Sequence, residues 1–157
     1  PSFELDIPPN SRTTHDAYLH MPRPTQLVAF TPHMHMRGRG LVLEAILPSG
    51  KVLTIAGVKD YNFNWQLGYE LAQPVKAPKG SKIILTSHFD NSVNNKYNPD
   101  PSKDVLWGDQ NWEEMQSGFL GLTFDINTDY TKAFLPSGPS LLPRGKLGPT
   151  LADLTFA

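Results

Sequence analysis

The residues best suited to chemistry are two histidines, His33 and His35, in the run 31–38. If this run is extended, alternate side chains share one face of a strand, and the two Cα atoms lie roughly 7 Å apart. Two imidazoles at this spacing can bind one metal ion. The alternative is a pair of surface histidines near a strand end, because a His-x-His match by itself has many false positives.

The apolar side chains around the histidines indicate where the core lies. Val28, Phe30, Met34 and Met36 form an apolar row of the kind that a strand buries. We therefore expect the two imidazoles to point away from the core. Since the chain has no cysteine, any metal must be held by histidine, methionine or carboxylate side chains.

Length and charge limit the classes of protein. A chain of 157 residues is expected to form one domain. With a formal net charge of -1 and no basic block, nucleic acid and anionic membrane surfaces are not expected partners. No apolar run approaches the length of a transmembrane helix. Because the chain starts at Pro1, we expect a mature or excised piece of a longer protein.

Composition predicts an all-β domain over residues 1–125. The 15 prolines and 12 glycines separate short apolar runs that are rich in β-branched and aromatic residues. We expect an irregular lead-in at 1–25 and a long ordered loop at 90–104, where Asn, Asp, Pro and Ser dominate. The expected strands lie at 26–37, 41–47, 52–56, 69–75, 81–89, 105–108 and 113–124.

The last part of the chain, 126–157, is an extended tail rich in Pro, Gly and Leu, without a sustained period of 2 or 3.6. Such a segment has no core of its own, so it is either disordered or laid along a partner. The repeated leucines favour docking on another domain or protein subunit.

Motifs spread along the chain resemble one known family. The central one is His33-Met34-His35 followed by Arg37-Gly38, and the others lie at 3–9, 63–66, 78–80, 90–92, 98–101, 107–108 and 114–115. Together they resemble the C-terminal domain of the copper type II, ascorbate-dependent monooxygenases. That family includes peptidylglycine α-hydroxylating and dopamine β-monooxygenases, and several motifs are similar to its bacterial members. The similarity spans about residues 3–125.

The resemblance implies an antiparallel β-sandwich of jelly-roll type that holds one copper ion through His33, His35 and Met115. It also implies O2 activation for C–H hydroxylation, ascorbate or another reductant, and a periplasmic or extracellular location. The donor set suits this chemistry, because imidazole binds both oxidation states of copper and a thioether favours Cu(I). By itself, Met115 is more readily an ordinary core methionine. The adjacent Glu113 and Glu114 predict that this strand end lies near water.

Other positions refine what the resemblance implies. His88 is a further candidate ligand or a group behind the ligands, although a histidine on the solvent face of a strand is the commoner outcome. Thr31, Ser117 and Phe119 stand where peptide-hydroxylating members have the Arg, Asn and Tyr that hold the substrate carboxylate. A peptide with a C-terminal glycine is therefore not the implied substrate.

Three functions remain open at this point. Family enzymes carry a preceding domain with a second copper, and 157 residues leave no room for it. The first function is thus the oxygen-activating part of a monooxygenase that works with another domain or subunit. The second is a non-enzymatic accessory or structural subunit of a larger extracytoplasmic assembly that keeps the jelly-roll fold. The third is copper carriage or storage.

Overall fold

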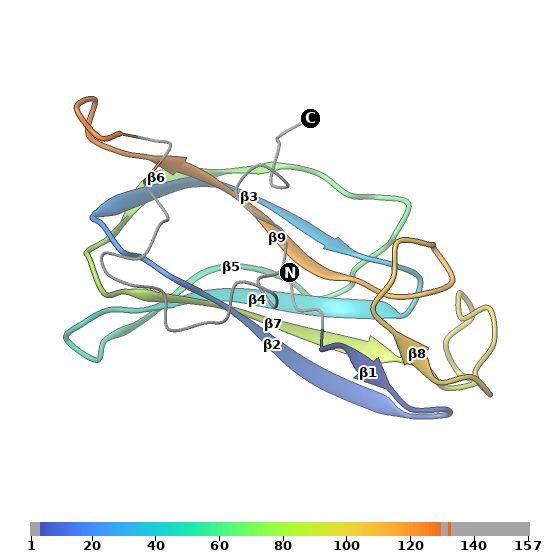
Figure 1. The fold of residues 1–157 in the computed structure, drawn as a ribbon. Coiled ribbons are helices and arrows are strands. Elements are labelled where there is room, and N and C mark those ends of the chain that lie inside the picture. The colour runs from blue at the N-terminus through green and yellow to red at the C-terminus, as the bar shows by residue number, and fades with distance from the viewer. Residues whose placement is uncertain (1–3, 130–131, 133–157) are drawn as a thin grey trace.

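The computed structural model describes residues 4–129 and 132, and in this part of the chain the strands form antiparallel sheets without an α-helix. Two sheets stack face to face as a sandwich, with the three-stranded sheet above the four-stranded one in Figure 1. The predicted all-β sandwich is confirmed. No helix long and apolar enough to cross a membrane occurs among the described residues.

The two large sheets are built from strands that are distant in sequence. The four-stranded sheet has the order β2 (Arg12–His20), β7 (Lys82–Asp90), β4 (Gly38–Ile46) and β5 (Val52–Val58). The three-stranded sheet has the order β6 (Tyr69–Ala77), β3 (Thr25–Met34) and β9 (Gln116–Thr123). A short pair, β1 (Asp6–Ile7) and β8 (Val105–Leu106), completes the described structure. Residues 35–37 connect β3 in the three-stranded sheet to β4 in the four-stranded sheet, so His35 is the first residue of this crossing.

The core lies between the two sheets and depends on a bulge in β3. The pairing of β3 shifts between Leu27 and Ala29, so Leu27 and Phe30 both point inward although they are three residues apart. The expected apolar row is therefore corrected at Val28, which is only half-buried, and also at Met36, which is half-buried in the turn after β3. Facing side chains come from β4 and β7, namely Leu41, Leu43, Ala45, Ile83, Leu85 and Phe89.

The first 25 residues are more regular than expected. Residues 12–20, assigned to an irregular lead-in, form the nine-residue strand β2 along the whole of β7. This strand has little apolar alternation, because β2 is at the edge of its sheet and its outer face is exposed. Its ladder with β7, rather than an apolar alternation, defines it as a strand.

Pro32 lies where β3 behaves as an edge, as its presence in a strand predicts. The pairing of β3 with β6 ends at Phe30, whereas its pairing with β9 continues to Met34. The hydroxyl of Tyr61 replaces the missing strand, because it accepts from Met34 N at 2.9 Å and donates to Met34 O at 2.6 Å. Burial raises the pKa of Tyr61 to about 12, so this hydroxyl keeps its proton.

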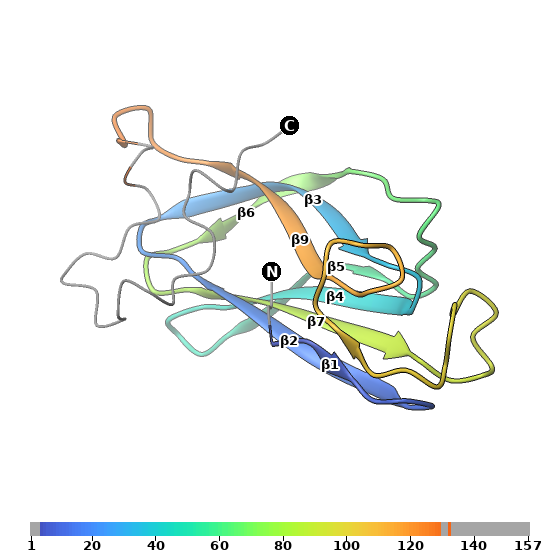
Figure 2. The same ribbon diagram turned by 45° about the vertical axis from the view of Figure 1, so that its right-hand side comes forward.

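The long loop 90–104 is ordered by its own amides, as predicted. Asn91 is fully buried, and its side-chain amide donates to the carbonyl oxygens of Ile7, Pro8 and Lys103. Its oxygen accepts from Arg37 Nε at 2.8 Å. The loop is thereby attached to the N-terminal segment and to the turn that follows β3. Figures 1 and 2 show the loops after β5, β7 and β8 at the same end of the sandwich.

Most of the tail, 130–131 and 133–157, lies outside the described residues, and with it the expected docking on a partner. Where the described chain continues past β9, Ile126 is 96% exposed.

Gln116 links the two sheets across the core. It is fully buried, and its Nε2 donates to His15 O at 2.7 Å on β2 and to Leu85 O at 2.9 Å on β7. We expect Gln116→Leu to lower the free energy of unfolding by roughly 1–3 kcal/mol, because both carbonyl groups lose a buried donor. Chemical denaturation measures this change. Gln26→Leu, on the exposed face of β3, is the matched control and should change stability by less than about 0.5 kcal/mol. Equal effects of the two variants would contradict the bridging role.

Candidate metal centre

His33 and His35 lie at the end of β3, on the face of the three-stranded sheet opposite the core residue Met34. Their ring centroids are 5.2 Å apart and their planes make an angle of 87°. Metal–nitrogen bonds are about 2 Å long, so one nitrogen of each ring can approach a single ion at this separation. The structure therefore brings the two imidazoles together, as predicted. His33 is half-buried, whereas His35 is only 3% exposed, which is deeper than the sequence indicated.

Met115 lies on the adjacent strand end. The ladder between β3 and β9 ends with the pairs His33–Ser117 and Met34–Gln116, and His35 and Met115 are the residues that follow and precede these strands, so extending the register by one step sets them opposite each other. Residues directly opposite each other in an antiparallel ladder point to the same face. The extended register therefore assigns Met115 to the face of the two imidazoles, and the residue is half-buried rather than enclosed in the core.

Glu114 fixes the two strand ends relative to each other. Its Oε2 accepts from His35 N at 2.7 Å and from Met115 N at 3.0 Å, and its Oε1 accepts from Arg37 N at 2.6 Å. One carboxylate therefore binds the backbone on both sides of the candidate site. The expectation that Glu113 and Glu114 mark a strand end near water is wrong for Glu114, which is fully buried.

The buried carboxyl group of Glu114 has an unusual environment. Burial raises its pKa to about 7, against the opposite effect of the three backbone donors. Arg37 is also buried, with 1% of its surface exposed, and its positive charge lowers the pKa of Glu114. Its guanidinium donates to Asn91 Oδ1 and, through Nη1, to Trp112 O at 2.9 Å. The opposite charges and their hydrogen bonds offset part of the desolvation cost of burying both groups.

The segment 61–68 covers both imidazoles. The ring of Phe63 packs edge-on against the ring of His35, with 5.8 Å between the ring centroids. Gln66 Oε1 lies 2.6 Å from His33 Nδ1. Tyr61 anchors the start of the segment on Met34. These contacts restrict the orientation of both rings, which is what a metal ligand requires of its surroundings.

Three uncharged side chains lie beside His33, whereas the carboxylate of Glu113 acts electrostatically on His35. Phe119 lies 6.2 Å from the ring of His33 and is 54% exposed, and Ser117 and Thr31 occupy the same face. These are the three positions where the sequence differs from peptide-hydroxylating enzymes. They lie beside His33 on the β3–β9 ladder. They offer hydroxyl groups and an aromatic surface rather than a cation.

The environment of His35 favours the neutral imidazole that a metal requires. Burial lowers the pKa of His35 and nearby His33 lowers it further, while the backbone at Glu113 and Gln110 acts in the opposite sense. Nδ1 of His35 is buried and makes no hydrogen bond of ordinary geometry with the protein. Among the described residues no cluster of three His, Cys, Asp or Glu side chains forms. Two imidazoles and one thioether are a suitable set for copper.

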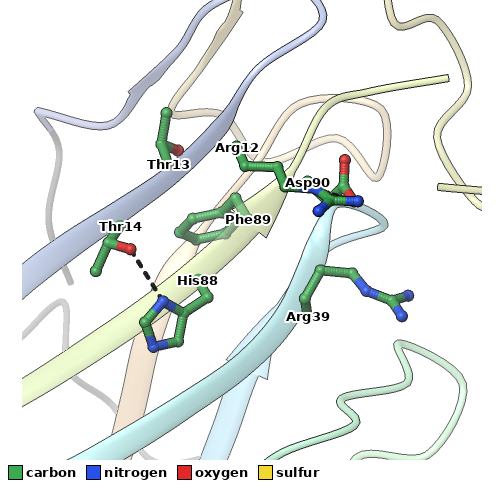
Figure 3. A pocket seen from close by; sticks show the side chains of 7 residues that line it. All are labelled: Arg12, Thr13, Thr14, Arg39, His88, Phe89 and Asp90. Atoms are coloured by element: carbon green, nitrogen blue, oxygen red, sulfur yellow. Dashed lines mark hydrogen bonds and ion pairs between the residues drawn. The ribbon is translucent and has the colours of Figure 1, made fainter. Parts of the chain in front are cut away.

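His88 lies elsewhere. It is on β7 in the four-stranded sheet, paired across the ladders with Thr14 and Gly40, and its side chain is on the exposed face. Its Nδ1 is 2.9 Å from Thr14 Oγ1 in a depression that Arg12 and Arg39 also line (Figure 3). The structure therefore does not bring His88 to the histidine pair, and the alternative of a histidine on a solvent face applies.

Comparisons with known proteins leave the family unassigned, because no protein-family model and no curated protein matches the chain.

Two residues of the site had no role assigned from the sequence. Glu114 and Gln66 both lie in motifs that carry the resemblance. Glu114 follows another glutamate and Gln66 ends a segment rich in amides, so the sequence does not indicate that either is buried or which group it bonds. The signal available was their proximity in sequence to Met115 and to the aromatic residues of 61–66. Only the folded chain shows which backbone or ring each one contacts.

Glu114→Gln tests the link between the strand ends. An amide keeps one acceptor oxygen and directs its NH2 group at backbone donors, so at least one of the three N–H groups loses its partner. We expect a loss of roughly 1–3 kcal/mol in the free energy of unfolding, together with faster amide exchange at His35 and Arg37. Denaturation and hydrogen exchange measure the two effects. The same substitution at half-buried Glu113 is the control, and an equal response there would contradict the role of Glu114.

Proposed function

We propose that residues 4–125 form the oxygen-activating copper domain of a copper-dependent monooxygenase, with His33, His35 and Met115 as the ligands. The observation that carries this proposal is the pair of imidazoles, 5.2 Å apart, beside the strand end that carries Met115. The shared hydrogen bonds of His35 and Met115 to Glu114 support the same grouping.

Each protein group has a distinct part in this proposal. The thioether of Met115 favours Cu(I), and the imidazoles of His33 and His35 bind both oxidation states. Copper, when bound, supplies the redox chemistry with O2 that hydroxylation of a C–H bond requires. Glu114 holds the ligand backbones, while Phe63 and Gln66 orient the rings.

The substrate is proposed to bind beside His33. Phe119 and the small side chains of Thr31 and Ser117 offer an uncharged surface there. A substrate is held on such a surface by apolar contact and by hydrogen bonds to hydroxyl groups, rather than by an ion pair with a carboxylate.

The electrons come from outside residues 4–125 in this proposal. Hydroxylation inserts one oxygen atom of O2 into the C–H bond and reduces the other to water, so a reductant must supply two electrons. Ascorbate, or a partner domain or subunit with its own copper, is the proposed source. A periplasmic or extracellular location belongs to the same proposal.

Copper binding tests the ligand set. We expect the purified protein to bind one Cu(I), and His33→Ala or His35→Ala to weaken its affinity by more than about 100-fold, beyond the effect typical of groups behind the ligands. Competition with a chromophoric Cu(I) chelator measures these affinities. His88→Ala is the matched control and should leave affinity unchanged. In X-ray absorption spectra, Met115→Leu should remove a sulfur neighbour of copper. Retention of copper by His33→Ala would contradict the proposal.

Oxygen consumption separates an enzyme domain from a copper carrier. With excess ascorbate, and after unbound copper has been removed, the copper-loaded protein is expected to consume O2 in an oxygen electrode, and the His33→Ala variant treated in the same way is not. Copper binding without consumption above that of the variant would instead support carriage or storage. A protein that binds no copper would support the accessory or structural function.

A further inference from the structure

We propose that Gln66 is a positioning residue that holds His33 in the Nδ1–H tautomer and so leaves Nε2 as the nitrogen for the metal. The inference deepens the proposed function and rests on it for the identity of the ion. The tautomer itself is a property of the metal-free chain.

The orientation of the Gln66 amide follows from its two contacts. Its Nε2 donates to Phe63 O at 2.7 Å, and its Oε1 lies 2.6 Å from His33 Nδ1. The reverse orientation would place two oxygen atoms, neither of which carries a hydrogen, against each other at the Phe63 carbonyl. The amide oxygen therefore faces the imidazole, and the network assigns the orientation.

The protonation pattern of His33 follows from the same contact. An amide oxygen only accepts, so Nδ1 of His33 must carry the hydrogen in a bond of 2.6 Å. A neutral imidazole has one N–H, and its lone pair is then on Nε2. A free histidine side chain prefers the opposite tautomer, with the hydrogen on Nε2. Gln66 therefore selects the less common form and aims the lone pair of His33 away from the 61–68 segment.

The segment that presents Gln66 is itself fixed. Trp65 N donates to Asn62 O at 2.8 Å and Asn64 N donates to Asn62 Oδ1 at 3.0 Å, which closes a turn just before Gln66. Tyr61, at the start, is bonded to both backbone groups of Met34, between the two histidines. The acceptor for His33 is thus attached to the same strand that carries His33, so the two keep their relative position.

His35 is fixed in a different way. Its Nδ1 makes no hydrogen bond of ordinary geometry, and its ring is held by burial and by the edge contact with Phe63. Gln66 bonds Nδ1 of His33, whereas Nδ1 of His35 makes no such bond, so a change at Gln66 is expected to alter the tautomer of His33 and not that of His35. This selectivity separates positioning of one ligand from a general disturbance of the site.

Nitrogen-15 NMR of the metal-free protein tests the tautomer. At about pH 8, where an ordinary imidazole is neutral, long-range correlations are expected to show His33 as the Nδ1–H form. Gln66→Leu should convert most of it to the Nε2–H form, while His35 is unchanged. Gln66→Glu should keep the Nδ1–H form, because a carboxylate oxygen still accepts. Gln73→Leu, on the exposed side of β6, is the control and should match the wild type.

Copper affinity gives the second measurement. Gln66→Leu is expected to weaken Cu(I) binding by about 10–100-fold, and Gln66→Glu to restore most of the loss. A wild-type His33 in the Nε2–H form, or no change of tautomer in Gln66→Leu, would overturn the inference. A change of tautomer with unaltered copper affinity would overturn the positioning role. If the tautomer responds as expected but the wild type binds no copper, the proposed function fails while the assignment of the tautomer stands.

Discussion

The arrangement of the candidate site depends on one buried carboxylate. Glu114 accepts hydrogen bonds from the backbone of His35, Arg37 and Met115, and it is fully buried. A charged group in such a place is costly unless it is well bonded, and removing it would leave three buried donors unpaired. The two strand ends are therefore held in one register, and the thioether cannot slide relative to the histidines without breaking this group of bonds.

Side chains also replace a missing strand on the other edge of β3. Beyond Phe30 the strand has lost its pairing with β6, and Pro32 lies where a backbone donor is not needed. The hydroxyl of Tyr61 then bonds both backbone groups of Met34. Glu114 bonds the backbone of the His-x-His run on one edge and Tyr61 bonds it on the other, so both edges have hydrogen-bond partners as in a strand inside a sheet. A ligand site on a strand end gains precision from this support.

A second layer of buried polar groups connects this end of the sandwich to the long loop. Arg37 and Asn91 are almost completely buried, and they bond each other and the carbonyl groups of segments that are distant in sequence. Such a network stabilises one conformation strongly when every group is satisfied. The length of the 90–104 loop is thus explained in part by structure, since its amides fasten the turn that follows the histidines.

The sequence by itself determined the fold class, the positions of most strands and the pairing of the two histidines on one face, because a period of 2 and turn residues depend only on neighbours in the chain. It did not reveal strand β2, whose exposed edge has little apolar alternation, or the bulge that places Leu27 rather than Val28 in the core. Only the tertiary structure decided that the backbones of His35 and Met115 meet at Glu114, that His88 belongs to the other sheet, and that Glu114 is buried. Those facts depend on register and on contacts between residues far apart in the sequence, and no local pattern encodes which strand ends will meet.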